Sequence, residues 1–257
     1  MIGRRIAAGA LSLAVLGTPF VASVPPVRAD HTSDANIPDL VMLAPNDFVI
    51  QQRPRGGRWL RFSTVIVNRG PGVFQVYGAD SDGASIGDEL PIVQQIQEPG
   101  GGFSPHPSTA TMFYSGDGHN HWHVRELQEW TLENSNAQVL ARGAKTGFCF
   151  WDNYDYGATT PAYYHPSTTD ACDIAPDGTV PMGLSVGWGD RYPYNIAFQY
   201  IDISGLPNGQ YLVTVTADPP AAGGGRFIER NEDNNSSWAL ISIKRKTVTV
   251  LQFAPVP

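Results

Sequence analysis

Hydrophobic and polar positions alternate with a period of two along most of the chain after residue 30. The clearest alternating segments are 59–67, 72–77, 194–203, 210–217 and 238–251. Clusters of Gly, Pro, Asn and Asp separate them, and longer loops are expected at 80–87, 99–107, 156–169 and 219–225. No segment has the period of an amphipathic helix. The pattern therefore predicts an all-β fold, a β-sandwich of mostly antiparallel strands with long loops.

The first 29 residues have a different pattern and are expected to lie outside this domain. Arg4 and Arg5 precede an uncharged stretch rich in Ala, Leu and Val, and Val27 and Ala29 occupy the small-residue positions of a cleavage site. The alternative to a signal peptide is an N-terminal membrane anchor. Prolines, however, shorten the apolar run below the roughly 20 residues that a membrane-spanning helix needs. We expect residues 1–29 to be a cleaved signal peptide and 30–257 to be one secreted domain without stable membrane insertion.

Composition and charge limit the functions that the chain is expected to have. The formal net charge is −7, only 16% of residues are charged, and no basic run occurs, so binding to nucleic acid is not expected. Among 17 basic residues only Lys145, Lys244 and Lys246 are lysines. The two cysteines, Cys149 and Cys172, stand in a chain predicted to be exported. They are therefore expected to form a disulfide rather than to remain as two buried thiols.

The most distinctive chemical motif is His119, His121 and His123, separated by single residues. On a β-strand, side chains at every second position face the same way, so the three imidazoles can converge on one ion. Imidazole nitrogen is a good ligand for copper, zinc, iron or nickel, and copper is favoured by its intrinsic affinity. The motif predicts a metal site.

Several motifs in fixed order around this triad resemble the lysyl oxidase family, the secreted copper- and quinone-dependent amine oxidases. The matching segments are 37–41, 119–123, 143–149, 187–192, 199–203, 207–211 and 229–235. The resemblance implies a single lysyl-oxidase-like catalytic domain over 30–257. The compact leader, the single cysteine pair and the lack of appended modules predict a bacterial exported member.

The resemblance implies a cofactor made from the protein itself. Tyr192 occupies the position that copper-dependent oxidation converts to a quinone, and Lys145 occupies the position whose amine joins that ring to give lysine tyrosylquinone. The implied reaction uses O2 to oxidise a primary amine, on a lysine-containing protein or a small molecule, to an aldehyde with release of ammonia and hydrogen peroxide. Glu126, Glu129 and Asp190 are the candidate general bases.

The resemblance also implies a calcium site that joins the two ends of the domain. The implied ligands are Asp39, the Leu40 carbonyl, Glu229, Asn231, Asn234 and Asn235. Oxygen ligands of this kind suit calcium. Asn231 stands where the family carries an acid, which lowers the expected affinity, and a plain polar turn over 231–235 is the alternative.

Two other function classes remain open on the sequence. A three-histidine site can hold zinc and activate water, which would give a secreted metallohydrolase in which Lys145 and Tyr192 have no role. Alternatively, the chain is a non-catalytic copper-binding β-sandwich that never forms the quinone. A further motif, Asn153, Tyr154 and Asp155, matches the signature of topaquinone amine oxidases, but in those enzymes the histidine pair follows the tyrosine. We expect this tripeptide to form a turn.

Overall fold

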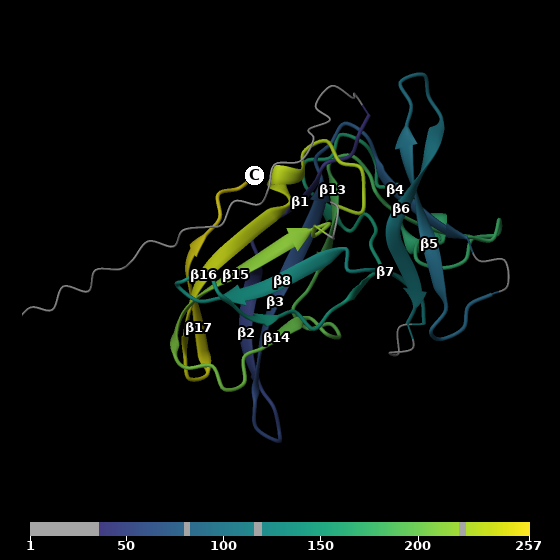
Figure 1. The fold of residues 1–257 in the computed structure, drawn as a ribbon. Coiled ribbons are helices and arrows are strands. Elements are labelled where there is room, and N and C mark those ends of the chain that lie inside the picture. The colour runs from purple at the N-terminus through teal and green to yellow at the C-terminus, as the bar shows by residue number, and fades with distance from the viewer. Residues whose placement is uncertain (1–35, 80–82, 116–119, 221–224) are drawn as a thin grey trace, which may run out of the picture.

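The computed structural model describes residues 36–79, 83–115, 120–220 and 225–257. Within these ranges the chain forms β-strands, one short helix and one turn of 3-10 helix, and neighbouring strands pair antiparallel (Figure 1). The predicted all-β fold is confirmed. The predicted signal peptide, residues 1–29, lies outside the described residues. No helix in the described part is long and apolar enough to cross a membrane.

The first sheet is organised around one long strand, β3 (Arg58–Asn68). One half of β3 pairs with β1 (Leu40–Met42) and β13 (Trp188–Tyr192), and the other half pairs with β2 (Asn46–Gln52) and β14 (Tyr200–Asp202). The short β11 (Tyr154–Asp155) extends the sheet beyond β13.

Two further sheets complete the fold. The second has the order β10 (Gly147–Phe148), β7 (Trp122–Arg125), β6 (Phe103–Tyr114), β5 (Glu89–Gln97), β4 (Phe74–Ala79) and β12 (Thr179–Leu184). The third has the order β17 (Thr247–Phe253), β16 (Ser236–Lys244), β15 (Gly209–Ala217), β8 (Gln128–Glu133) and β9 (Val139–Arg142). The helical turns are α1 (Pro166–Thr169) and η1 (Glu232–Asn234).

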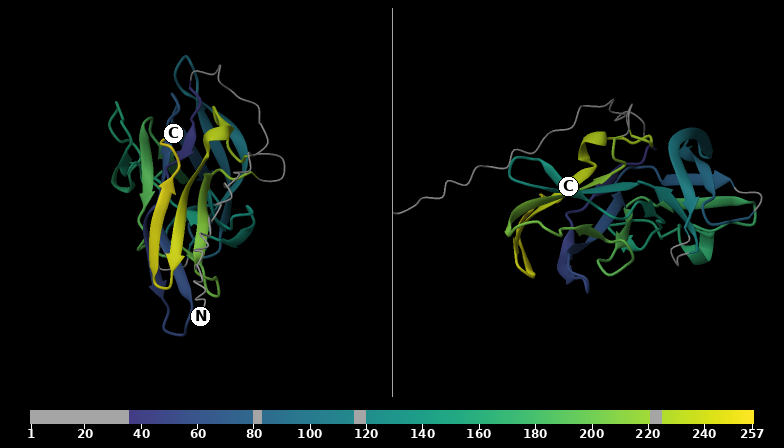
Figure 2. Two further views of the ribbon diagram at one scale, coloured as in Figure 1. Left: turned by 90° about the vertical axis from the view of Figure 1, so that its left-hand side faces the viewer. Right: turned by 60° about the horizontal axis from the view of Figure 1, so that its bottom comes forward.

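The third sheet covers the first, and the second sheet stands beside both (Figures 1 and 2). Strand β3 is therefore buried on both faces, and residues 62–68 are all inaccessible. Leu60, Phe62 and Ile66 point into the main core, whereas Val65 and Val67 join Val41 in a second small cluster. A strand covered on both sides loses the simple apolar–polar alternation of a half-exposed strand.

A chain of aromatic contacts runs through the main core. Trp130 packs edge-on against Phe62, with ring centroids 5.3 Å apart, and against Phe148 at 5.9 Å. Phe148 in turn packs edge-on against Tyr192 at 5.5 Å. Edge-to-face pairs of this kind each contribute about 1 kcal/mol beyond the burial of their area. The core thus fixes the position of the Tyr192 ring.

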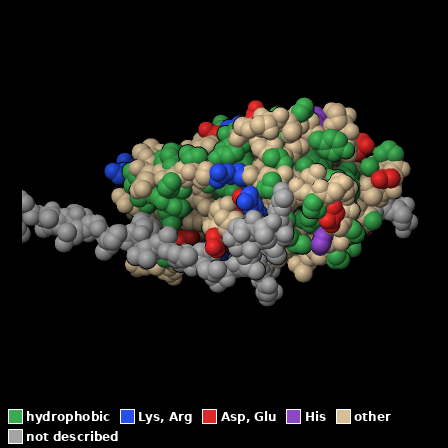
Figure 3. Space-filling view, turned by 90° about the horizontal axis from the view of Figure 1, so that it is seen from above, with side chains coloured by type: hydrophobic (Ala, Val, Ile, Leu, Met, Phe, Trp, Pro, Cys, Tyr) green, Lys and Arg blue, Asp and Glu red, His purple; other side chains and the backbone are tan. Residues whose placement is uncertain are grey.

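The surface carries few charges. On the face shown in Figure 3, acidic and basic side chains are scattered singly among apolar and uncharged ones. This agrees with the low fraction of charged residues, 16%, in the sequence.

Three predicted segments differ from the structure. Of the strand predicted at 194–203 only β14 forms, because the chain turns at residues 193–199 and Phe198 adopts a left-handed backbone (φ 57°). The segment 238–251 is a hairpin, β16 and β17, reversed at Arg245, where φ is also 57°. The loop predicted at 99–107 is shorter, because β6 begins at Phe103. A left-handed residue that is not glycine leaves no clear mark on the hydrophobic pattern.

Gly189 gives a test of how tightly β13 is packed. A Cβ at this position would lie 2.5 Å from the Ile66 carbonyl oxygen and 2.6 Å from Val67 Cγ1, so Gly189→Ala forces β13 away from β3. We expect it to lower the free energy of unfolding by about 2 kcal/mol in urea denaturation. Gly100→Ala is the matched control, because nothing lies within 4 Å of its Cβ position. Equal stability of the two variants would contradict this packing.

Candidate active site

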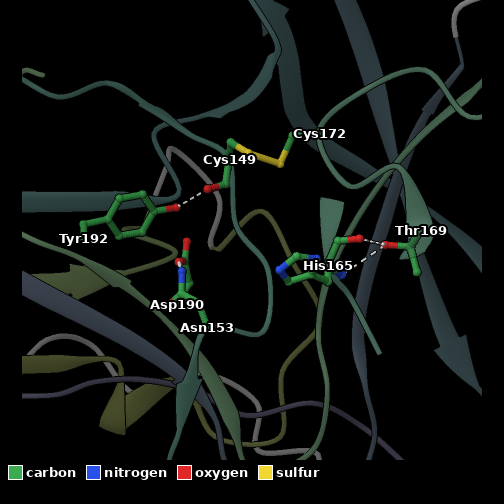
Figure 4. Close-up of a disulfide and its surroundings, with 7 residues drawn as sticks. All are labelled: Cys149, Asn153, His165, Thr169, Cys172, Asp190 and Tyr192. Carbon is green, nitrogen blue, oxygen red and sulfur yellow. Dashed lines mark hydrogen bonds between the residues drawn. A yellow bond between two sulfur atoms is a disulfide. The ribbon is translucent and has the colours of Figure 1, made fainter. Parts of the chain in front are cut away.

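Tyr192 lies at the end of β13, buried and directed away from solvent. Its ring is 5% exposed, and its hydroxyl donates a hydrogen bond of 2.7 Å to the carbonyl oxygen of Cys149 (Figure 4). Burial, and then the nearby Asp190 carboxylate, raise the pKa of this phenol well above its usual value. Tyr192 is therefore a neutral phenol in a fixed orientation.

Lys145 lies in the turn between β9 and β10, beside Tyr192. Its Nζ is 5.4 Å from the centroid of the Tyr192 ring and 5.4 Å from that of Phe148. Backbone hydrogen bonds fix both of its neighbours in the chain, from Ala144 N–H to Tyr200 O and from Glu126 N–H to Thr146 O. The structure thus brings together two residues that are 47 positions apart in the sequence.

His121 and His123 face the same side of the chain. Their ring centroids are 4.4 Å apart, and Trp122 between them is fully buried in the core. The alternation of side chains expected of a strand is present here, although His121 lies one residue before β7, which begins at Trp122. His119 lies outside the described residues, so the third member of the predicted triad is not placed.

The two histidines, Lys145 and Tyr192 line one cavity of about 280 Å³. Its other lining residues are Cys149, Trp151, Asn153, Asp190, Arg191, Pro193 and Ile196. The cavity is lined by His123 of β7 in the second sheet and by Asp190, Arg191 and Tyr192 of β13 in the first. Residues from two sheets therefore share one partly open cavity.

Asp190 is the acid inside this cavity. It is 2% exposed, and on β13 it points to the same side as Tyr192, two residues later. Asn153 Nδ2 donates a hydrogen bond to Asp190 Oδ1, while Oδ2 is buried without a hydrogen-bond partner among the described residues (Figure 4). Burial raises the pKa of Asp190 to about 7, against the opposing effects of Tyr192, Asn153 and Lys145.

The other two candidate bases lie elsewhere. Glu126 and Glu129 line a separate cavity of about 330 Å³, which Lys145 also lines but Tyr192 and the two histidines do not. Both are half-exposed, and each forms a salt bridge, Glu126 with Arg226 and Glu129 with Arg142. Asp190 is thus the candidate base that shares a cavity with Tyr192 and the histidines.

The Cys149–Cys172 disulfide joins the segments on either side of the cavity. The Cys149 carbonyl accepts the Tyr192 hydroxyl hydrogen, and the Cys172 carbonyl accepts the N–H of Trp122, the residue between the two histidines. The predicted disulfide is present, and it joins the backbone on the tyrosine side to the backbone on the histidine side.

The residues of the cavity fit the two groups that the sequence implies. Two imidazoles at this spacing can bind one copper ion together. A lysine side chain has enough rotatable bonds for Nζ to move from 5.4 Å above the neighbouring ring into bonding contact with a ring carbon. Tyr154 of the alternative topaquinone motif packs instead against the Val41, Val65 and Val67 cluster.

A second group of polar residues joins the N-terminal strand to the loop before β16. Glu229 is fully buried, accepting hydrogen bonds from Leu40 N–H (2.7 Å) and Asn235 Nδ2 (3.1 Å). Asn234 Nδ2 donates to both carboxylate oxygens of Asp39, at 3.0 and 3.1 Å. The side-chain oxygens of Asn234 and Asn235 are buried without hydrogen-bond partners among the described residues.

This second site contains more acid than the sequence indicated. Carboxylate oxygens of Asp218, Glu229 and Glu232 lie within 4.8 Å of one another. Burial, together with the neighbouring acids, raises the pKa of Asp218 to about 6 and that of Glu229 well above its usual value. Asn231 instead caps η1 by accepting the Asp233 N–H at 2.9 Å.

Sequence reasoning missed several of these roles. The turn predicted for 153–155 is wrong, because Tyr154 and Asp155 form β11, and the amide of Asn153 orients Asp190. Asp218 stands in an Asp-Pro step directly before the predicted loop 219–225, 11 residues before Glu229, and such a step ordinarily indicates only a turn. Only the folded chain shows that these side chains meet.

Comparisons with known proteins identify the family of the chain. The family model described as lysyl oxidase matches residues 92–252, more than half of the chain. The chain is 30% identical to human lysyl oxidase homolog 2 over 104 residues, which is 40% of this chain and 12% of that protein. It is 31% identical to chicken protein-lysine 6-oxidase over 112 residues, 41% of this chain and 24% of that protein. The aligned regions thus span at most a quarter of the length of these relatives. Because the family model matches more than half of the chain, the chain belongs to the lysyl oxidase family.

Proposed function

We propose that this chain is a secreted copper-dependent primary amine oxidase whose cofactor forms from Lys145 and Tyr192. The observation that carries the proposal is the position of the Lys145 Nζ, 5.4 Å from the Tyr192 ring in a cavity shared with His121 and His123. The named relatives, protein-lysine 6-oxidase and lysyl oxidase homolog 2, support the same class. We expect the substrate to be a lysine side chain of a protein or a small primary amine.

The histidines would hold copper, with His119 as the expected third ligand. Bound copper would supply, with O2, the oxidation of the tyrosine, and the quinone formed from Tyr192 and Lys145 would supply the electron acceptor for the substrate amine, with O2 as the final oxidant. The chain's own residues keep the reacting ring in place. The edge of Phe148 and the Cys149 carbonyl fix the orientation of Tyr192.

Asp190 is the proposed general base. Its unbonded oxygen, Oδ2, is buried in the cavity, while Oδ1 is fixed by Asn153. A carboxylate whose pKa lies close to neutrality can both take up a substrate proton and release it again. Glu126 and Glu129 are already paired with arginines and face another cavity.

We further propose that the second polar group binds calcium. Asp39, Glu229, Asn234 and Asn235 already meet there, and Asp218 and Glu232 add negative charge. Buried carboxylates in such proximity repel one another unless a cation or protons neutralise them. Calcium would join β1 to the segment before β16 and stabilise the fold.

Cofactor formation is tested by peptide mass spectrometry of copper-loaded, air-exposed protein. We expect a crosslinked Lys145–Tyr192 peptide that reacts with phenylhydrazine, and loss of both crosslink and peroxide release in Tyr192→Phe and Lys145→Arg, since neither side chain can form the bond. Tyr194→Phe and Lys244→Arg are the matched controls, expected to keep both. Uncrosslinked peptides from fully copper-loaded protein would support the non-catalytic alternative. A hydrolytic activity that survives Tyr192→Phe would support the zinc alternative.

The role of Asp190 is tested by its pH dependence. Because a general base acts when deprotonated, kcat should fall as the pH decreases through about 7, the pKa that burial gives Asp190. Asp190→Asn should lower kcat by about 10²- to 10⁴-fold while the crosslink still forms. A comparable loss in Glu129→Gln, with Asp190→Asn active, would place the base in the other cavity.

The calcium site is tested by thermal unfolding at several pH values. A raised pKa means that the folded state favours the protonated carboxyl, so this stability is present at low pH and is lost as pH rises through the folded pKa. For Asp218, with a pKa of about 6 against a usual value of 3.8, the loss in metal-free protein amounts to about 3 kcal/mol. Calcium should restore the Tm above pH 6. Glu229→Gln should abolish this effect and Glu98→Gln, on an exposed turn, should not. A Tm insensitive to calcium would contradict the site.

A further inference from the structure

One end of the molecule concentrates positive charge in a protein that is acidic overall. The turn between β2 and β3 and the turn between β16 and β17 lie together at the lower end in Figure 1 and in the left view of Figure 2. Arg58 connects them by donating a hydrogen bond of 2.9 Å from Nη1 to the Arg245 carbonyl. We call the exposed side chains of these turns the basic patch: Arg53, Arg55, Lys244, Arg245 and Lys246.

The charges of the basic patch are not neutralised within the fold. Other arginines, at 125, 142, 191 and 226, form salt bridges with acids, whereas the five residues of the patch form none among the described residues. Asp202, which is opposite Trp59 in the β3–β14 register, is an anionic carboxylate close to Arg53 and offsets part of that one charge, while no such acid lies against the other four residues among the described ones. The patch therefore keeps an excess of positive charge.

A cation–π stack joins the patch to the candidate active site. Trp59 and Tyr200 stack with ring centroids 3.8 Å apart, and the Arg53 guanidinium lies 4.3 Å above Trp59. An exposed tryptophan could instead bind a carbohydrate by stacking on a sugar ring. Here Tyr200 covers one face of Trp59 and the Arg53 guanidinium lies close to the ring, so the indole is poorly placed for such stacking. An arginine held against an aromatic ring still presents its N–H edge to oxyanions. The geometry favours carboxylate recognition over carbohydrate stacking.

The stack also contacts the walls of the cavity. Arg61, beside Trp59 and Tyr200, donates hydrogen bonds to the carbonyls of Tyr194 (2.7 Å) and Ile196 (3.0 Å), and Ile196 lines the Tyr192 cavity. On the other side, the Tyr200 carbonyl accepts the N–H of Ala144, the residue before Lys145. Positive charge thus extends from the edge of the site to the end of the sandwich.

We propose that the basic patch binds an acidic segment of a polypeptide whose lysine enters the cavity, so that the enzyme prefers lysines in acidic sequence contexts. The inference rests on the proposed amine oxidase function. A free cationic amine gains nothing from a positive surface beside the site, whereas a polypeptide with carboxylates next to its lysine is oriented by it. The hydrogen bonds of Arg61 to Tyr194 and Ile196 link the stack beside the patch to one wall of the cavity, which favours one ligand for both, the substrate itself.

The experiment compares two peptides, each with one lysine flanked by glutamates or by glutamines, and a small primary amine, using copper-loaded enzyme. We expect kcat/KM for the glutamate peptide to exceed that for the glutamine peptide at low salt, with the difference decreasing as salt screens the charges. A triple variant, Arg53→Gln/Arg55→Gln/Lys246→Gln, removes three charges of the patch. It should reduce kcat/KM for the glutamate peptide by about threefold to tenfold and leave kcat/KM for the small amine unchanged. Arg53→Gln should show part of this loss, and Arg69→Gln, exposed on the β3–β4 turn, should show none.

A lysine-free glutamate peptide provides a readout that does not depend on catalysis. Its binding, followed by fluorescence anisotropy, should weaken in the triple variant. If no amine is oxidised but this binding behaves as expected, the amine oxidase function fails and the patch remains an acidic-peptide site. Equal rates for the two peptides, or a preference that the triple variant keeps, would overturn the inference. Patch-dependent binding of an anionic polysaccharide, without binding of the glutamate peptide, would overturn it in favour of a polymer anchor.

Discussion

The edge-on contact between Phe148 and Tyr192 is the interaction on which the candidate site depends. Phe148 is fixed from behind by Trp130, which packs on Phe62 of the central strand, so the ring of Tyr192 is positioned by the hydrophobic core itself. Lys145 lies over the same two rings. The proposed cofactor chemistry on Tyr192 would require a ring orientation that thermal motion does not disturb, and close packing supplies such an orientation.

Much of the fold follows from the sequence because period-two patterning is a local property. It identified β3, β4, β15 and β16, and the Asn208–Gly209 turn before β15. It failed where the backbone leaves the strand conformation without glycine, as at Phe198 and Arg245. The alternation of His121, Trp122 and His123 was predictable for the same local reason, whereas the pairing of Lys145 with Tyr192 was inferred from the family resemblance and not from any local pattern.

Long-range encounters account for what the sequence did not reveal. Trp59 and Tyr200 stack although 141 positions separate them, and Asp39 meets Asn234 across 195 positions. The orienting role of Asn153 depends on β11 pairing with β13. None of these contacts has a periodic signature, since each arises from the topology that places distant strands side by side. Buried carboxylates at Asp190 and Glu229 share this origin: each is surrounded by residues from several segments, and that enclosure shifts its pKa.

The composition of the basic patch has a consequence for the chain itself under the proposed amine oxidase function. Three of the five side chains in the patch are arginines, as is Arg61 between the patch and the cavity, and Lys145 is the sole lysine among the first 243 residues. A guanidinium carries positive charge at every physiological pH but is not a primary amine. The three arginines attract carboxylates without offering a primary amine, so within the patch only Lys244 and Lys246 could serve as substrates of the proposed reaction. A patch of lysines alone would offer that reaction five amines, so the arginines separate most of the charge from reactivity.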